Sequence, residues 1–258
     1  MNKKGQVTIF VIVGIIIAVL VGLIFFLRSQ MLIGPVTPEV FEREMDRIGE
    51  EFGDCVIRVS TPVLEILGKQ GGYLNPGPDT YRLYNDSRVS YLCYNIEGED
   101  KCYNRMLTVK QMEEEIKSTL DIGLLQCGIS RGGNLGYDVS VQGNPNPEIE
   151  IEREVVKINV NYPIKIKSKR TGLVVERKDF IINVDVPLGA LYDVAMEIVN
   201  SEAEYGDFDP LIYMLAKKGE YKVYKHKPYP DKVYIIKKEG KNYIFQFFVQ
   251  SEPVERGY

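Results

Sequence analysis

The sequence predicts an α+β protein in which an apolar N-terminal helix precedes a domain of antiparallel sheet and packed helices. Three observations carry this prediction: an uncharged run at 7–27, helical spacing of apolar residues at 37–67, and strand-like alternation that begins at 136. We divide the chain into a leader at 1–6, the run at 7–27, a joint at 28–36, a domain at 37–250 and a tail at 251–258. The pattern leaves open whether that domain is one unit or a helical neck at 37–67 with a sheet domain at 136–250.

The run from Val7 to Leu27 contains 21 consecutive uncharged residues. A helix of that length, at about 1.5 Å per residue, crosses a bilayer core of roughly 30 Å, so a transmembrane helix is expected. Lys3 and Lys4 precede the run, and only Arg28 follows it closely. The N-terminus is therefore expected in the cytoplasm and the domain outside the cell membrane.

The end of the apolar run lacks a small-x-small cleavage site, which argues against a cleaved secretory signal. The residues before the run, Lys3-Lys4-Gly5-Gln6, resemble the class III signal of archaeal type IV pilin-like surface proteins. This resemblance implies processing between Gly5 and Gln6, after which the apolar helix packs on copies of itself in a filament. The family usually carries Glu five residues into the mature chain, where this sequence has Phe10. The layout of the whole chain is also similar to a group of surface proteins from small-genome archaea, which implies no particular activity.

The charge balance of the residues that follow the apolar run excludes nucleic acid as a partner. With Lys3, Lys4 and Arg28 set aside, 29 basic residues face 36 acidic ones, a net charge of about −7. Nucleic acid binding needs a basic patch that follows the phosphate backbone, and no basic block is present. The expected partners are the membrane, further copies of this chain through the N-terminal helix, and a surface partner that the sequence does not identify.

Four cysteines follow the predicted membrane helix, and an even number in an oxidising compartment favours disulfides. Cys93 and Cys102 flank turn-forming residues between two tyrosine-rich arms, so we expect a bridged hairpin. This pairing leaves Cys55 for Cys127. A zinc site is the alternative, although the sequence has no Cys-x-x-Cys pair and a single histidine, His226.

Residues 37–67 predict a helix, with Thr37 as the N-cap and Pro38 in the first turn. Apolar residues recur in steps of three and four: Phe41, Met45, Ile48, Phe52, Cys55 and Val59. We expect this face to pack on the domain's own sheet, and a dimer seam or filament ridge is the alternative. Pro62 is expected to bend or restart the helix.

Residues 68–80 predict a loop in which Gly71, Gly72 and Tyr73 are candidates for a binding surface. A rigid turn with a packed tyrosine is the alternative explanation. Asn85, in Asn-Asp-Ser, is a candidate N-glycosylation site in an outer loop. Thr108 and Gln111 form a capping-box pattern that predicts the start of the next helix.

Alternating residues from Val156 to Ile166 predict a long half-buried strand, with Pro163 at an edge or a bulge. Phe180 to Val186 predicts its antiparallel neighbour. Helices are then expected at 188–203 and 210–217, followed by a hairpin that pairs 233–236 with 243–249.

The sequence offers no catalytic, cofactor-binding or metal-binding constellation of known pattern, so none is predicted. Asp207 and Asp209 could do paired acid and base work, but a helix cap for Pro210 is the simpler explanation. The 17 tyrosines, against no tryptophan, are unusual and could form a binding surface.

Together these features predict a non-enzymatic surface protein that crosses the cell membrane once, as a pilin-like structural or adhesive subunit. A permanently anchored binding module for a glycan or a protein is the alternative. An anchored hydrolase is a third class.

Overall fold

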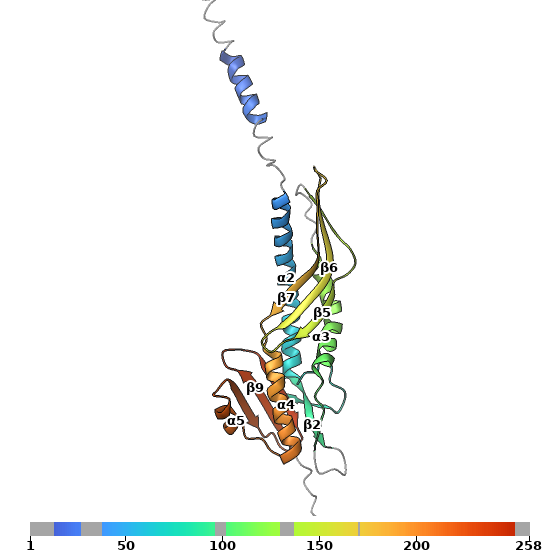
Figure 1. Ribbon diagram of the computed structural model, residues 1–258, viewed down its shortest axis with the longest axis vertical. Helices are drawn as coiled ribbons and strands as arrows, with labels where there is room; N and C mark the ends of the chain where they lie inside the picture. The colour runs from blue at the N-terminus through green and yellow to red at the C-terminus, as the bar shows by residue number, and fades with distance from the viewer. Residues whose placement is uncertain (1–12, 27–37, 96–101, 130–136, 170, 251–258) are drawn as a thin grey trace, which may run out of the picture.

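A computed structural model describes residues 13–26, 38–95, 102–129, 137–169 and 171–250, and it confirms the α+β class (Figure 1). Residues 13–26 are helical, and every side chain in that segment is exposed. Within the described ranges, no helix combines the length and apolar character needed to span a bilayer. Gly5 and Gln6, the rest of the predicted membrane run, the joint and the tail lie outside the described residues.

Helix α2 (Pro38–Lys69) is the longest described element. Its predicted apolar face is buried at Phe41, Met45, Ile48, Phe52 and Cys55, and it packs on strand β7 (Val174–Val184) and on β10 (Ile244–Val249). The stripe is therefore covered by the domain's own strands, as predicted. Pro62 lies inside the helix, so the expected restart at that residue is wrong.

One sheet is built around β6 (Val156–Ser168), which has alternating burial along its length. Strands β4 (Tyr137–Val141), β5 (Asn146–Ile151) and β7 all pair with β6 in antiparallel register. The β6–β7 register shifts between Asn161 and Ile164, around Pro163, which confirms the predicted bulge. The edge alternative is wrong, because β6 is the central strand.

The second sheet has the order β1-β2-β10-β9-β8, and β3 also pairs with β2. Its strands are β1 (Tyr81–Tyr84), β2 (Ser87–Asn95), β3 (Cys102–Asn104), β8 (Tyr221–His226), β9 (Lys232–Lys238) and β10. Strands β9 and β10 form the predicted C-terminal hairpin. Strand β10 also pairs in parallel with β2, which no local pattern of the sequence predicts.

Three further helices complete the domain: α3 (Val109–Gly123), α4 (Leu188–Tyr205) and α5 (Pro210–Ala216), with a short 3₁₀ turn η1 (Leu124–Gln126) after α3. The capping box of Thr108 and Gln111 is present at α3. Asp209 caps α5 through hydrogen bonds from the backbone N–H groups of Leu211 and Ile212, at 2.8 and 3.1 Å. The predicted caps at Thr108 and Asp209 are therefore confirmed, whereas the predicted N-cap Thr37 lies outside the described residues.

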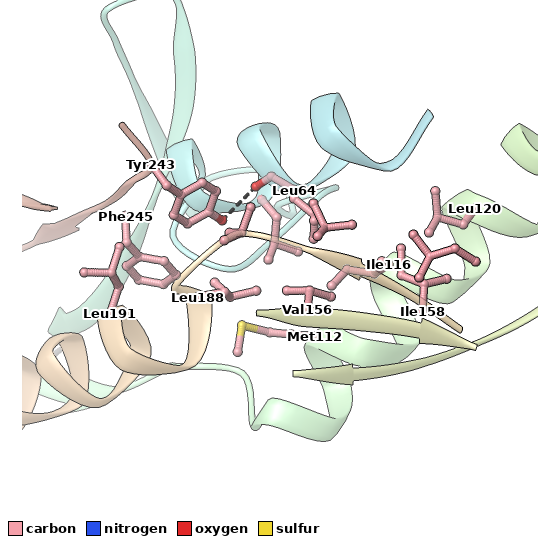
Figure 2. Close-up of a cluster of buried hydrophobic side chains, with 14 of the residues drawn as sticks. Leu64, Met112, Ile116, Leu120, Val156, Ile158, Leu188, Leu191, Tyr243 and Phe245 are labelled. Atoms are coloured by element: carbon pink, nitrogen blue, oxygen red, sulfur yellow. Dashed lines mark hydrogen bonds between the residues drawn. The ribbon is translucent and has the colours of Figure 1, made fainter. Parts of the chain in front are cut away.

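One large hydrophobic core joins α2, α3, α4 and both sheets (Figure 2), and Val89, Val233 and Phe248 form a second, small cluster. Four of its side chains come from four different elements: Leu64 of α2, Met112 of α3, Val156 of β6 and Leu188 of α4. The Tyr243 hydroxyl donates a hydrogen bond of 2.8 Å to the carbonyl oxygen of Leu64, which ties the C-terminal hairpin to α2. The helix at 38–69 and both sheets thus contribute side chains to one core.

We expect Gly68→Ala to destabilise the domain by about 1–3 kcal/mol, because overpacking a rigid contact forces backbone shifts. A Cβ at this position would press on the carbonyl oxygen of Ile244 and lie 2.6 Å from the Tyr243 hydroxyl. Gly77→Ala is the matched control, because its Cβ would first meet Thr80 at 3.7 Å. Urea unfolding should show a loss for Gly68→Ala and a change within about 0.5 kcal/mol for the control. Equal stabilities would contradict the packing argument.

Candidate functional site

Both predicted disulfides are present in the structure. Cys55 of α2 pairs with Cys127 after η1, with a Cα–Cα distance of 5.7 Å. Cys93 of β2 pairs with Cys102 of β3, at a Cα–Cα distance of 5.2 Å. All four sulfurs are therefore engaged and cannot serve as zinc thiolates. Elsewhere in the described ranges, no three His, Cys, Asp or Glu side chains gather where they could hold a metal ion.

The candidate binding loop is a buried turn at the end of α2. Gly71 and Gly72 have φ values of +73° and +92°, which side chains rarely adopt, and both are buried. A Cβ on Gly72 would lie 2.9 Å from the sulfur of Met112. The Tyr73 hydroxyl donates a hydrogen bond to the Arg105 carbonyl. This geometry fits the rigid turn with a packed tyrosine, and a ligand role for the three residues stays a prediction.

The candidate glycosylation residue, Asn85, is exposed in the two-residue turn between β1 and β2. Asn85 and Asp86 both have positive φ, at 47° and 60°, as the tight turn of a β-hairpin requires. Asparagine and aspartate tolerate this conformation better than most residues. The turn alone explains both residues, and the exposed position leaves Asn85 accessible for modification.

The tyrosine-rich strand β2 uses its side chains to hold the second sheet together. The Tyr91 hydroxyl donates a hydrogen bond of 2.7 Å to Asp231, whose carboxylate also accepts from Arg82 at 3.2 Å. Arg82 donates in addition to the Pro228 carbonyl at 3.1 Å. These contacts join β1 and β2 to the loop before β9, so this tyrosine has a structural role.

The candidate functional site is a cleft of about 390 Å³ between α4, α5 and β8. A volume of this size lies in the range that small ligands occupy. Tyrosines from all three elements line it: Tyr192 of α4, Tyr213 of α5 and Tyr221 of β8. Helix α4 also contributes Asp193 and Glu197. We call this surface the tyrosine cleft.

Ion pairs at the rim of the tyrosine cleft balance its charge. Arg153 donates to Asp193 at 2.8 Å and to the Tyr221 hydroxyl at 3.3 Å. Lys217 donates to Glu197 at 3.1 Å, and its Nζ lies 5.2 Å from the ring centre of Tyr213. The rim thus presents both carboxylates and cations around aromatic walls.

The Tyr213 hydroxyl is a buried polar atom of the tyrosine cleft that makes no hydrogen bond of ordinary length in the described structure, although the Glu197 carboxylate lies close to it. Burial, and then the nearby Glu197 carboxylate, raise the pKa of this phenol, so it stays protonated at neutral pH. A buried hydroxyl that is poorly hydrogen-bonded costs free energy, part of which a ligand oxygen could recover. The cleft is therefore suited to bind a small hydroxylated or carbonyl-containing group.

The two aspartates considered for paired acid and base work, Asp207 and Asp209, each have a separate structural partner. Asp209 caps α5, and Asp207 forms an ion pair with Lys225. The hydrogen bond from Lys225 lowers the pKa of Asp207, so this carboxylate is not a proton donor at neutral pH. The structure therefore explains both aspartates without glycosidase chemistry.

The sequence alone identifies only part of this site. Tyr213 and Tyr221 belong to the tyrosine-rich C-terminal part of the chain, but Tyr192 stands alone in a helical stretch. Its spacing of four from Met196, which also lines the cleft, places both on one helical face. This spacing is the signal by which the sequence could indicate Tyr192 as a site residue. No local pattern indicates that α5 and β8 face this side of α4.

We expect folding stability to fall steeply above about pH 10, because many tyrosines are ionised only in the unfolded chain. Burial raises the pKa of Tyr137 to about 12, and it raises the pKa of Tyr162, Tyr192 and Tyr243 above the ordinary value of 10.0. A raised pKa stabilises the folded state below pH 10, and this contribution is lost as the pH rises through the folded value. Each such tyrosine removes about 1.4 kcal/mol per pH unit.

The measurement is urea unfolding between pH 7 and pH 12, with tyrosinate absorbance recorded in parallel. Ionisation of the buried tyrosines and unfolding should occur together. Full ionisation of the folded protein near pH 10 would contradict the burial of these phenols.

Comparison of the chain with known protein families, with curated proteins and with solved structures found no match.

Proposed function

We propose that this chain is a non-enzymatic surface protein that crosses the membrane once at residues 7–27, a pilin-like structural or adhesive subunit. The observation that carries the proposal is the sequence Lys3-Lys4-Gly5-Gln6 placed directly before a 21-residue apolar run. The basic leader keeps the N-terminus in the cytoplasm, and the domain from residue 37 onward lies outside.

Two structural features support this proposal. The two disulfides suit an oxidising compartment outside the cytoplasm. Helix α2 follows the apolar segment in the chain, and both sheets share its core. Because α2 shares its core with both sheets, a force on α2 is transmitted to the whole domain. A subunit held by an N-terminal helix requires this.

The test is the intact mass of the protein isolated from its native membrane. The proposal expects loss of residues 1–5, so that Gln6 is the first residue. A Gly5→Leu variant is the control, because a bulky residue before the cut should block processing and leave the full mass. Retention of Met1 in the unaltered protein would contradict pilin-like processing and leave a permanently anchored protein.

The tyrosine cleft favours a second candidate function, a permanently anchored module that binds a glycan. Aromatic side chains have apolar faces and polar tips, and the cleft adds carboxylates, cations and the buried Tyr213 hydroxyl. Sugar rings carry both C–H faces and hydroxyl groups, which match these two kinds of contact. The site therefore fits a neutral sugar better than a strongly charged ligand.

Binding of the full chain in detergent to an array of immobilised neutral oligosaccharides tests this second candidate. Tyr192→Ala should weaken binding about tenfold, because a stacking surface is lost. Tyr205→Ala is the control, since Tyr205 is exposed and does not line the cleft. Equal losses in both variants, or no binding to the array, would count against the cleft as a glycan site.

A further inference from the structure

Helix α5 exposes an apolar ridge. Leu211, Ile212 and Leu215 share one side of this short helix and are 62%, 67% and 70% exposed. The opposite side of α5 packs on the domain. The ring centres of Phe208 and Tyr213 lie 5.3 Å apart, and the Val223 N–H approaches the Met214 sulfur. Exposed clusters of large aliphatic side chains usually mark interaction sites. We call Leu211, Ile212 and Leu215 the α5 ridge.

A groove of about 730 Å³ runs between α2 and strand β7. Gly49 and Gly53 of α2 form one wall, and their missing side chains let Phe180 and Ile182 of β7 approach. Strand β7 is an edge strand, because β6 is its only strand partner in the described part of the chain. We call this surface the α2–β7 groove.

Two exposed aliphatic residues border the α2–β7 groove. Ile57 of α2 is 39% exposed, and Ile181 of β7 is 65% exposed. Because side chains alternate along a strand, the Ile181 side chain lies on the opposite face of β7 from Phe180 and Ile182, at the outer rim of the groove. Because the removal of apolar surface from water drives association, a matching apolar ridge would gain from filling the groove.

The charges of the groove and the ridge are complementary. Glu50 and Asp54 line the groove, and neither has an ion-pair partner among the described residues. Helix α5 is followed directly by Lys217 and Lys218, and Lys218 is exposed and likewise without an ion-pair partner in the described ranges. Opposite charges that face each other across an interface steer association and set its register.

We propose that the α5 ridge of one copy docks in the α2–β7 groove of a second copy of this chain. The inference deepens the proposed role as an assembling subunit and rests on it. The apolar ridge covers Ile57 and the outer rim at Ile181, and Lys218 approaches Glu50 and Asp54. Because the ridge and the groove are different surfaces, the contact is heterologous, and repeating it builds a closed ring or an open chain of copies.

Cysteine cross-linking of the full chain in its membrane tests the contact. All four native cysteines are in disulfides, so an introduced cysteine is the free thiol of the described chain. Copies with Ile212→Cys are produced together with copies that carry Ile181→Cys and then oxidised mildly. We expect a mixed dimer linked by one new disulfide. Leu83→Cys, which is 71% exposed and outside the ridge, replaces Ile212→Cys in the control and should give little cross-linking.

Charge reversal supplies a second readout. Glu50→Lys with Asp54→Lys should reduce the 212–181 cross-link about tenfold, and Lys218→Glu in the ridge-bearing copy should restore part of it. Absence of the cross-link, an equal yield from the Leu83→Cys control, or quenching of a label at residue 212 by lipid would overturn the proposal. The cross-linking results can be interpreted whether or not residues 1–5 are removed. Filaments without the 212–181 cross-link would overturn this contact alone, and the cross-link in a protein that retains Met1 would overturn only the pilin-like processing.

Discussion

Replacing Cys55 and Cys127 together by alanine is expected to lower the free energy of unfolding by about 4 kcal/mol. The disulfide links residues that are 72 positions apart, and a cross-link over a long loop removes much of the entropy of the unfolded chain. It also holds α2 to the segment that follows α3 and η1. Urea unfolding in detergent, under oxidising conditions, measures the loss.

The second disulfide gives the matched control. Cys93 and Cys102 are separated by 9 positions, so the same chain-entropy argument gives about 2.7 kcal/mol for their removal. The expected order is therefore a larger loss for the 55–127 pair. An equal loss, or the reverse order, would show that local strain or residual structure in the unfolded state outweighs loop length.

Lys232→Met is expected to destabilise the fold by about 3–5 kcal/mol, because it leaves a buried carboxylate without its cation. Glu202 of α4 is 3% exposed, and its carboxylate accepts hydrogen bonds from Lys232 Nζ at 2.7 Å and from the Tyr234 hydroxyl. Lys232 also donates to the carbonyl oxygen of Gly206, at the end of α4, at 2.6 Å. The lysine therefore joins the end of α4 to β9.

Two variants separate this effect from a general loss of charge. Lys222→Met removes a lysine that pairs with Glu239 at the surface, and it should cost less than about 1 kcal/mol. The double variant Glu202→Leu/Lys232→Met should recover part of the loss, because the buried charge disappears with its partner. Thermal unfolding of the three variants checks both points. A Lys232→Met protein as stable as Lys222→Met would contradict the buried pair.

Features that depend on a few neighbouring residues can be predicted from the sequence. The Thr108 capping box, the Asp209 cap and the alternation of β6 all rest on contacts within one element or one turn. The hairpin disulfide likewise follows from spacing. In each case the chemistry that fixes the structure lies within a short stretch of chain, so a local pattern contains it.

Features that depend on distant segments cannot be predicted in the same way. The parallel pair of β2 and β10 joins Tyr91 to Phe248, and apolar strands carry no mark of which neighbour they will take. Pro163 is compatible with an edge or a bulge, and only the pairing of β6 on both sides decides between them. The tyrosine cleft needs α4, α5 and β8 together, so its residues can be suspected one by one but not assembled.

The disulfide between Cys55 and Cys127 also determines how the chain responds to mechanical force. The proposed surface protein, held at its N-terminus, would be pulled whenever its outer end is dragged by flow or by a bound partner. The covalent bridge carries that tension past the 72-residue loop, so the loop cannot lengthen. At about 3.5 Å per extended residue, the disulfide prevents roughly 250 Å of extension. In stretching experiments, the oxidised protein should therefore yield a shorter fully extended length than the reduced protein by about this amount.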